Sequence, residues 1–355
     1  MIRKIFFIIF TLIFLFIING CKKTRVNTIK VLNENFSLNN FFSIKDSIII
    51  DIPNKYLFSY IKDISVFKNG MYLCVASKKF PILKLENNKY IKNIGRIGQG
   101  PNEYNFPLTK ISCDSTGKFF IASDGPNALN IYFYNGSKLM KKNFYKLKRI
   151  YDVELYENKI IIGLAGRAKY RIILYDTAFN LISKKIKLPK VASMLENIGT
   201  PFWTFQRNGN EIISNISYPL HIYRSIIKGN RIISKEILPN LKLKNYGEID
   251  TTLSLDNTFK MTRKKRLRLY ARMGKLFWIL KNKNKYVGMY FYQDKKSKAK
   301  FNLFIVDENK KLLELPINNH KDALTLIPVG DHLINYSFIK KEERVFLKIL
   351  KLKLK

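Results

Sequence analysis

The sequence has few of the residues on which most catalytic and metal sites depend. It contains three histidines and three cysteines, and its 26 Asp and Glu residues are far outnumbered by 64 Lys and Arg residues. His320 and His332 do not lie at metal-ligand spacing on one element, and the nucleophile motif G-x-S-x-G is absent. We therefore predict no catalytic residue, no metal ligand and no cofactor.

Acidic side chains are too scarce to balance the basic ones, and the formal net charge is +38. The basic residues are spread along the whole chain rather than gathered in one tail or helix, which favours a general bias in composition. An attraction to anionic lipid headgroups or acidic glycans is the alternative. Because the N-terminus also predicts export of the chain, we expect no nucleic-acid partner.

The N-terminus has the pattern of an export signal. A charged start at Met1–Lys4 is followed by an apolar run from Ile5 to Ile18, which is short for a membrane span, and then by Gly20 and Cys21. The segment Ile18–Cys21 resembles a bacterial lipobox, although Asn19 departs from the usual small residue. We predict a signal peptide over residues 1–20, lipidation of Cys21 and a linker over residues 21–43. An uncleaved anchor or ordinary cleavage would also export the chain.

The remaining two cysteines do not suggest a disulfide framework. Cys74 and Cys113 each lie in a short apolar segment typical of a strand, and no further cysteines accompany them. We predict two buried free thiols.

Sustained helical spacing of apolar residues is hard to find after the signal peptide. Instead, short apolar runs alternate with Gly and Asn turns, which is typical of antiparallel strands. Units of four such strands recur every 40 to 50 residues or so, the spacing of propeller blades. The units run over residues 61–94, 111–144, 153–186, 202–237, 276–315 and 323–354. We predict an all-β fold, a six-bladed β-propeller of four-stranded antiparallel blades over residues 44–355.

The two ends of this region indicate how the ring closes. A strand at Ser47–Ile52 has no partner in the first unit, and the last unit is one strand short, so the two are expected to pair. The final stretch, Phe346–Lys355, alternates Leu or Ile with Lys, which predicts a half-buried strand rather than a basic helix. Residues 239–274 break the repeat with a basic run at 263–268. They are interpreted as a long connection between blades, or alternatively as a lid or docking loop.

The most specific motif runs from Asn93 to Pro107, with the sequence NIGRIGQGPNEYNFP. It resembles the inter-blade loop of NHL-type propellers, and more closely the six-bladed lipoprotein propellers common in Bacteroidota, with a turn, an apolar strand and Asp124 following. The resemblance covers about residues 91–134 and implies the fold rather than an activity. Gly95, Gly98 and Gly100 precede prolines rather than a helix, which excludes a dinucleotide site, and we expect them to adopt positive φ.

The same region supplies the candidate site. Arg96, Glu103, Asp124 and Asn127 are predicted to bind a ligand at one face of the propeller. The simpler alternative is that Arg96 pairs with Glu103 across the loop and that Asp124 caps a turn.

Together these observations predict a monomeric, lipid-anchored propeller in the cell envelope, facing the periplasm. We expect it to act as a non-enzymatic binding or scaffold protein for a peptide, a glycan or an envelope protein. The alternative is a metal-dependent enzyme, lactonase-like or lyase-like, with its site on the propeller axis.

Overall fold

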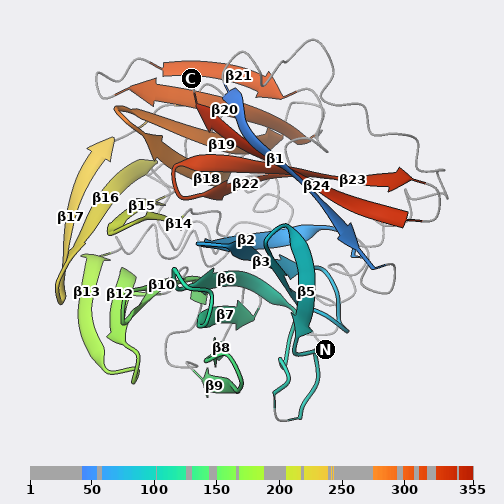
Figure 1. Ribbon diagram of the computed structural model, residues 1–355. Helices are drawn as coiled ribbons and strands as arrows, with labels where there is room; N and C mark the ends of the chain where they lie inside the picture. The colour runs from blue at the N-terminus through green and yellow to red at the C-terminus, as the bar shows by residue number, and fades with distance from the viewer. Residues whose placement is uncertain are drawn as a thin grey trace, which may run out of the picture.

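The computed structural model describes residues 42–53, 58–100, 102–124, 130–143, 150–164, 168–187, 205–216, 220–238, 241, 243, 275–293, 299–307, 312–317, 325–341 and 344–354. These residues form six four-stranded antiparallel sheets that follow one another as the blades of a six-bladed β-propeller (Figure 1). The predicted fold class is confirmed. Among the described residues, no helix is long and apolar enough to span a membrane. The predicted insertion at 239–274 lies almost entirely outside the described residues.

The first three blades follow the predicted units closely. Blade 1 contains β2 (Ile61–Phe67), β3 (Gly70–Val75), β4 (Ile82–Glu86) and β5 (Lys89–Ile94). Blade 2 contains β6 (Leu108–Cys113), β7 (Phe120–Asp124), β8 (Asn130–Tyr134) and β9 (Leu139–Asn143). Blade 3 contains β10 (Ile150–Tyr156), β11 (Lys159–Leu164), β12 (Tyr170–Asp176) and β13 (Leu181–Lys187). The first strands of blades 2 and 3 begin three residues before the predicted units, at Leu108 and Ile150.

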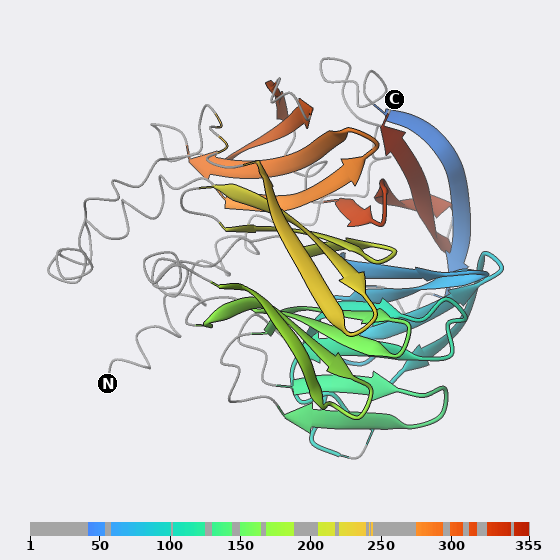
Figure 2. The same ribbon diagram turned by 90° about the vertical axis from the view of Figure 1, so that its left-hand side faces the viewer.

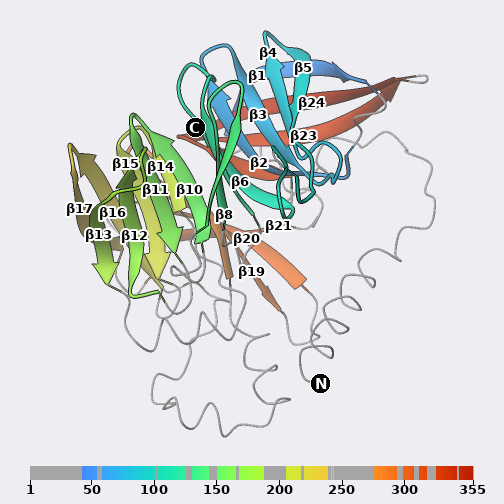
Figure 3. The same cartoon turned by 90° about the horizontal axis from the view of Figure 1, so that it is seen from below.

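Blades 4 and 5 have the same construction. Blade 4 contains β14 (Phe205–Asn208), β15 (Glu211–Ile216), β16 (His221–Lys228) and β17 (Arg231–Leu238). Blade 5 contains β18 (Lys275–Asn282), β19 (Lys285–Gln293), β20 (Ala299–Asp307) and β21 (Leu312–Ile317). The outermost strands β13 and β17 lie beside each other, as Figures 1 and 3 show.

The sixth blade closes the ring with both ends of the chain. It contains β22 (Leu326–Val329), β23 (His332–Lys341) and β24 (Arg344–Leu354), and its outermost strand is β1 (Phe42–Ile52). β1 pairs with β24 in antiparallel register, from Phe42 opposite Leu354 to Ile52 opposite Val345. The predicted closure, and the assignment of the C-terminal stretch to a strand, are confirmed. Closing the ring in this way removes a pair of free sheet edges.

The hydrophobic core is divided among the interfaces between consecutive blades. β24 shows the arrangement, because both of its faces are covered. Leu347 and Ile349 pack into the cluster shared with blade 1, and Leu352 packs into the cluster shared with blade 5. The expectation of a strand with one solvated face was therefore too simple.

The antiparallel order separates two kinds of connection onto opposite ends of the ring. The tight turns between the first and second strands, and between the third and fourth strands, lie at one end, here called the turn face. It comprises residues 68–69, 87–88, 114–119, 135–138, 157–158, 177–180, 209–210, 229–230, 283–284 and 330–331. Residues 76–81 and both ends of the segment 95–107 lie at the other end, here called the loop face. Figure 2 shows the start of β1, in blue, beside the C-terminal end of β24, in dark red.

Candidate functional site

The predicted motif forms a tightly bonded loop between blades 1 and 2. Ile97 and Tyr104 form a parallel bridge, in which Gly98 N–H donates to Tyr104 C=O at 2.9 Å and Tyr104 N–H donates to Arg96 C=O at 2.8 Å. Ile97 N–H also donates to Lys78 C=O at 2.9 Å, which ties the loop to the neighbouring connection of blade 1. The backbone of the loop is therefore fixed by its own hydrogen bonds.

Arg96 and Glu103 pair across this loop. Arg96 Nε donates to Glu103 Oε1, and Gly100 N–H donates to Glu103 Oε2 at 2.7 Å. The Gly100 N–H and the Arg96 guanidinium both favour the ionised carboxylate, so the pKa of Glu103 is lowered. The Glu103 side chain is 12% exposed, whereas the Arg96 side chain is 73% exposed. Glu103 thus stabilises the loop, and Arg96 projects into solvent.

The three glycines of the motif differ in backbone conformation and in the space around them. Gly95 has φ +68, as predicted, and a Cβ there would lie 2.5 Å from the Tyr104 ring. Gly98 and Gly100 do not have positive φ, so the prediction was wrong for both. A Cβ on Gly98 would lie 1.9 Å from Glu103 Oε2, which means that the missing side chain makes room for the Glu103 carboxylate.

Tyr132 connects this loop to Asp124. Its hydroxyl accepts from Asn105 N–H at 2.8 Å and donates to Asp124 Oδ2 at 3.1 Å. Asp124 is buried and also accepts from the N–H and Nδ2 of Asn130, at 3.1 and 2.6 Å. Asp124 therefore joins the end of β7 to the start of β8, as the capping alternative expected.

The structure brings Arg96, Glu103 and Asp124 into one bonded assembly, but it gives Glu103 and Asp124 internal partners. Their role in binding a ligand stays a prediction. Asn127 and Cys21 lie outside the described residues. Sequence reasoning missed Tyr132, and a tyrosine in the middle of an apolar strand offered little signal beyond its hydroxyl, which needs a partner when buried.

A second polar assembly links the innermost strands of the first four blades. β2, β6 and β10, in blades 1 to 3, each carry an irregularity at the same place, after Ile61, Leu108 and Ile150, and β18 of blade 5 carries one after Leu276. The residue that resumes the ladder is Asp63 in blade 1, Lys110 in blade 2 and Asp152 in blade 3. The repeat therefore sets these three charged side chains at equivalent positions.

These three residues form a chain of ion pairs. Lys110 Nζ lies 3.2 Å from Asp152 Oδ2 and 3.7 Å from Asp63 Oδ1, and Asp63 Oδ2 accepts from Ile111 N–H at 2.9 Å. Burial opposes the charge on Lys110, but the two carboxylates outweigh this effect and raise its pKa. Because one ammonium group faces two buried carboxyl groups, burial still raises the pKa values of Asp63 and Asp152.

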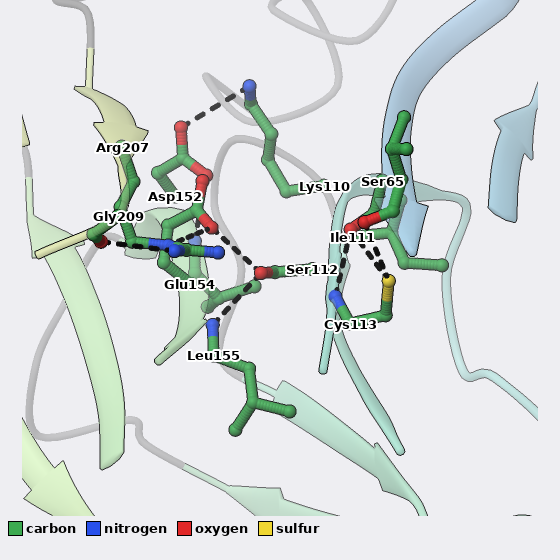
Figure 4. A network of polar contacts seen from close by, with 12 residues as sticks. Ser65, Lys110, Ile111, Ser112, Cys113, Asp152, Glu154, Leu155, Arg207 and Gly209 are labelled. Carbon is green, nitrogen blue, oxygen red and sulfur yellow. Dashed lines mark hydrogen bonds and ion pairs between the residues drawn. The ribbon is translucent and has the colours of Figure 1, made fainter. Parts of the chain in front are cut away.

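Two residues further along β2 and β6, serine hydroxyl groups bridge the same blades (Figure 4). Ser65 Oγ accepts from Cys113 N–H at 2.8 Å, and Ser112 Oγ accepts from Leu155 N–H at 2.9 Å. In each case a hydroxyl of one blade satisfies a backbone donor of the next blade. Ser112 Oγ also donates to Glu154 Oε2 at 2.7 Å.

Between blades 3 and 4 an ion pair replaces the hydroxyl bridge. Arg207 Nε donates to Glu154 Oε2 at 3.1 Å, and the guanidinium carbon lies 5.7 Å from the centre of the Tyr156 ring. The inner-strand assembly thus holds neighbouring blades together, and its polar groups are paired with one another.

The histidines and cysteines in the described part of the chain are not grouped as metal ligands. His221 Nδ1 pairs with Glu236, and His332 Nδ1 lies 3.0 Å from Asp331 Oδ1. Within the described residues, no three His, Cys, Asp or Glu side chains are grouped to hold a metal ion. Cys74 and Cys113 are buried and free, as predicted.

Comparisons with known proteins show the fold. No protein-family profile matches the chain, and no curated protein matches its sequence. A Bacteroides fragilis NCTC 9343 protein inferred to be exported has a similar structure, with a TM-score of 0.65 and 12% identity over 91% of this chain and 98% of that chain. The WD40 repeats of RRP9 match with a TM-score of 0.47 and 10% identity over 88% of this chain and 100% of that chain. The second likeness is too low to support an argument about function.

Proposed function

We propose that this protein is an exported propeller, tethered to a membrane through lipidated Cys21, that binds a ligand without catalysis at its loop face. The export pattern of residues 1–20 supports the location, and the likeness to a Bacteroides fragilis protein inferred to be exported agrees with it. The motif at residues 93–107 supports a relationship to the lipoprotein propellers that it resembles. The ligand is a peptide, a glycan or an envelope protein that carries an anionic group.

The exposed guanidinium of Arg96 is the observation that carries this proposal. Its Nε is held by Glu103, and among the described residues its two terminal nitrogens have no hydrogen-bond partner. A guanidinium held in this way is oriented before a ligand arrives, so less side-chain entropy is lost on binding. Its free edge matches the geometry of a carboxylate, phosphate or sulfate group.

Phe106 in the same loop adds an apolar contact. Its side chain is 59% exposed, although two residues that precede it in the loop are anchored to blade 2. Asn102 Oδ1 accepts from Leu139 N–H at 3.2 Å, and Asn105 Oδ1 lies 3.3 Å from Lys141 Nζ. An exposed aromatic ring on a fixed loop is typical of a binding surface.

The test compares binding by the full chain and by three variants. Acidic peptides and uronic-acid or sulfated oligosaccharides are arrayed at physiological salt, and affinities for the strongest binders are measured by calorimetry. We expect Arg96→Gln to weaken binding about tenfold or more. Lys79→Gln removes the same charge from an exposed side chain on the same face and is expected to change affinity less than about twofold.

Glu103→Gln separates orientation from charge. It keeps Arg96 but weakens the bond that orients it, so we expect an intermediate loss of affinity. Equal losses in Arg96→Gln and Lys79→Gln would show non-specific attraction to a basic protein and would contradict the proposal. About one bound Ca²⁺ or Zn²⁺ per purified full chain would favour the enzymatic alternative instead.

A further inference from the structure

The turn face is rich in exposed positive charge. Its turns and the residues that flank them carry exposed basic side chains at Lys68, Lys89, Lys118, Lys138, Lys228, Arg231, Lys283 and Lys285. These residues come from blades 1, 2, 4 and 5, so the charge is distributed around the ring rather than gathered on one blade.

Carboxylates on the same face are largely occupied by local contacts. Asp114 accepts from Thr116 and Phe119 N–H, and Asp176 accepts from Asn180 N–H at 2.7 Å. Glu157 is exposed and lies 3.3 Å from Lys159 Nζ. The exposed lysines and Arg231 of the turn face are therefore left largely uncompensated, and the face is complementary to an anionic surface.

The N-terminal segment joins the propeller on this same face. β1 begins at Phe42, opposite Leu354 at the end of β24 (Figure 2). The turn at 330–331 lies at that same end of the ring, because Leu333 pairs with Leu352. Residues 1–41 include the apolar run Ile5–Ile18 and Cys21. Whether the apolar run or lipidated Cys21 holds the chain on a bilayer, the tether is attached to the propeller at the turn face.

We infer that the turn face docks on the anionic headgroups of the bilayer to which the chain is tethered, with the loop face directed away from it. This inference rests on the proposed membrane tether and not on the ligand of Arg96. Each lysine near an anionic membrane surface strengthens attachment about fivefold at physiological salt. Phe119, which is 40% exposed on the turn face and stacks on Phe133, adds an apolar side chain that reaches the interface.

The experiment measures which face the membrane covers. The full chain is inserted into preformed vesicles of phosphatidylcholine alone, or with about one third phosphatidylglycerol. Lysines are then labelled with a membrane-impermeant amine reagent, and each site is quantified by mass spectrometry. Lys68, Lys118, Lys138 and Lys283 report on the turn face. Exposed lysines at the opposite end, Lys78, Lys79, Lys300 and Lys340, report on the loop-face side.

We expect labelling of the turn-face lysines to slow about fivefold or more in the anionic vesicles and to recover near 0.5 M salt, roughly where screening shortens to a few ångströms. Labelling at the loop-face end should not change. Equal labelling of both sets in both vesicle types, or protection of the loop-face end, would overturn the inference. The inference would also be overturned if a soluble acidic polysaccharide protected the turn-face lysines and anionic vesicles did not.

Two matched variants sharpen the result. Replacing Lys68, Lys118, Lys138 and Lys283 by Gln should remove the protection of Lys89 and Lys228, which stay on the same face. Replacing Lys78, Lys79, Lys300 and Lys340 by Gln removes equal charge and should preserve that protection. Arg96→Gln should preserve it too, so failure of the proposed ligand site and failure of membrane docking give different outcomes.

Discussion

Lys110 on β6 and Asp152 on β10 form an ion pair between two blades, with Nζ 3.2 Å from Oδ2. The Asp152 side chain is 4% exposed and the Lys110 side chain 28% exposed, so the carboxylate depends on this cation far more than a surface carboxylate would. Asp63 on β2 shares the same lysine at 3.7 Å. One side chain therefore joins three consecutive blades at their innermost strands.

Replacing Lys110 by Met should strongly destabilise the propeller. Two buried carboxyl groups would lose their cation, and the expected loss in free energy of unfolding is about 3 kcal/mol, the low end for a broken buried pair because Lys110 is partly exposed. Urea unfolding of the full chain, followed by tryptophan fluorescence, measures it. Lys159→Met, which breaks a pair with exposed Glu157, should cost less than about 1 kcal/mol. Equal losses in the two variants would contradict the role of the buried pair.

The Lys110→Met loss should also depend on pH. Without the lysine, burial keeps the pKa values of Asp63 and Asp152 raised in the folded state, opposed only in part by the backbone hydrogen bonds to Asp63. The folded variant then holds protons that the unfolded chain has already released, so its stability falls as pH rises through the unfolded carboxyl pKa of 3.8. The difference from the parent protein should be smaller at about pH 4 than at pH 7. A difference that does not change with pH would show that lost packing, rather than charge, is responsible.

Ring closure can be tested with two neighbouring residues of β1. Ile50 is 1% exposed and packs in the cluster between blades 6 and 1, whereas Ile49 is 56% exposed. We expect Ile50→Ala to lower the free energy of unfolding by about 2–4 kcal/mol, and Ile49→Ala to change it by less than about 0.5 kcal/mol. Chemical denaturation measures both. Similar small effects would mean that β1 adds little to the closed ring.

Gly95 and Gly209 separate the cost of backbone conformation from the cost of a clash. Both have positive φ, +68 and +59, but a Cβ on Gly95 would meet the buried Tyr104 ring at 2.5 Å, and a Cβ on Gly209 would meet nothing within 4 Å. Gly209→Ala should cost about 1 kcal/mol, from conformation alone. Gly95→Ala should cost about 2 kcal/mol more, because Tyr104 must move. Equal costs would mean that the loop adapts without displacing the ring.

The buried thiols should be unreactive in the folded protein. Burial raises the pKa values of Cys74 and Cys113 to about 12, so almost no thiolate is present near neutral pH. At about pH 8, we expect iodoacetamide to modify both sites in urea and neither in the native state, as read by mass spectrometry of the two peptides. Between pH 9.0 and about 12 the unfolded chain loses these protons first, so stability should fall as pH rises. Native modification at the rate of a free cysteine would contradict this.

Most of the strands followed directly from local sequence. Short apolar runs bounded by Gly or Asn turns placed strands such as Lys159–Leu164 and Glu211–Ile216 at their observed bounds. The first strands of blades 2 and 3 were predicted too short because Lys110 and Asp152 interrupt their apolar pattern. A charged residue in an apolar run suggests that the strand has ended, unless the residue is known to have an ion-pair partner. For Lys110 and Asp152 that partner lies on another blade.

The candidate site was predicted in part. The motif identified the loop, and its opposite charges suggested that Arg96 and Glu103 pair, which is what the structure contains. The reason for Gly98 was not accessible, because it depends on where the Glu103 carboxylate lies in the folded loop. The ion-pair chain of Asp63, Lys110 and Asp152 was missed, although aligning the units at Ile61, Leu108 and Ile150 brings the three residues into one column.

The sequence by itself determined the class of fold, the number of blades and the closure by β1, because these follow from short-range alternation, turn residues and a count of strands. Tertiary structure decided which charged groups are buried and paired, and at which end of the ring the N-terminal segment and the exposed lysines meet. Those features arise between strands that are distant in the sequence. The free energy of a buried charge depends on the partner that folding brings to it, and no local pattern records that partner.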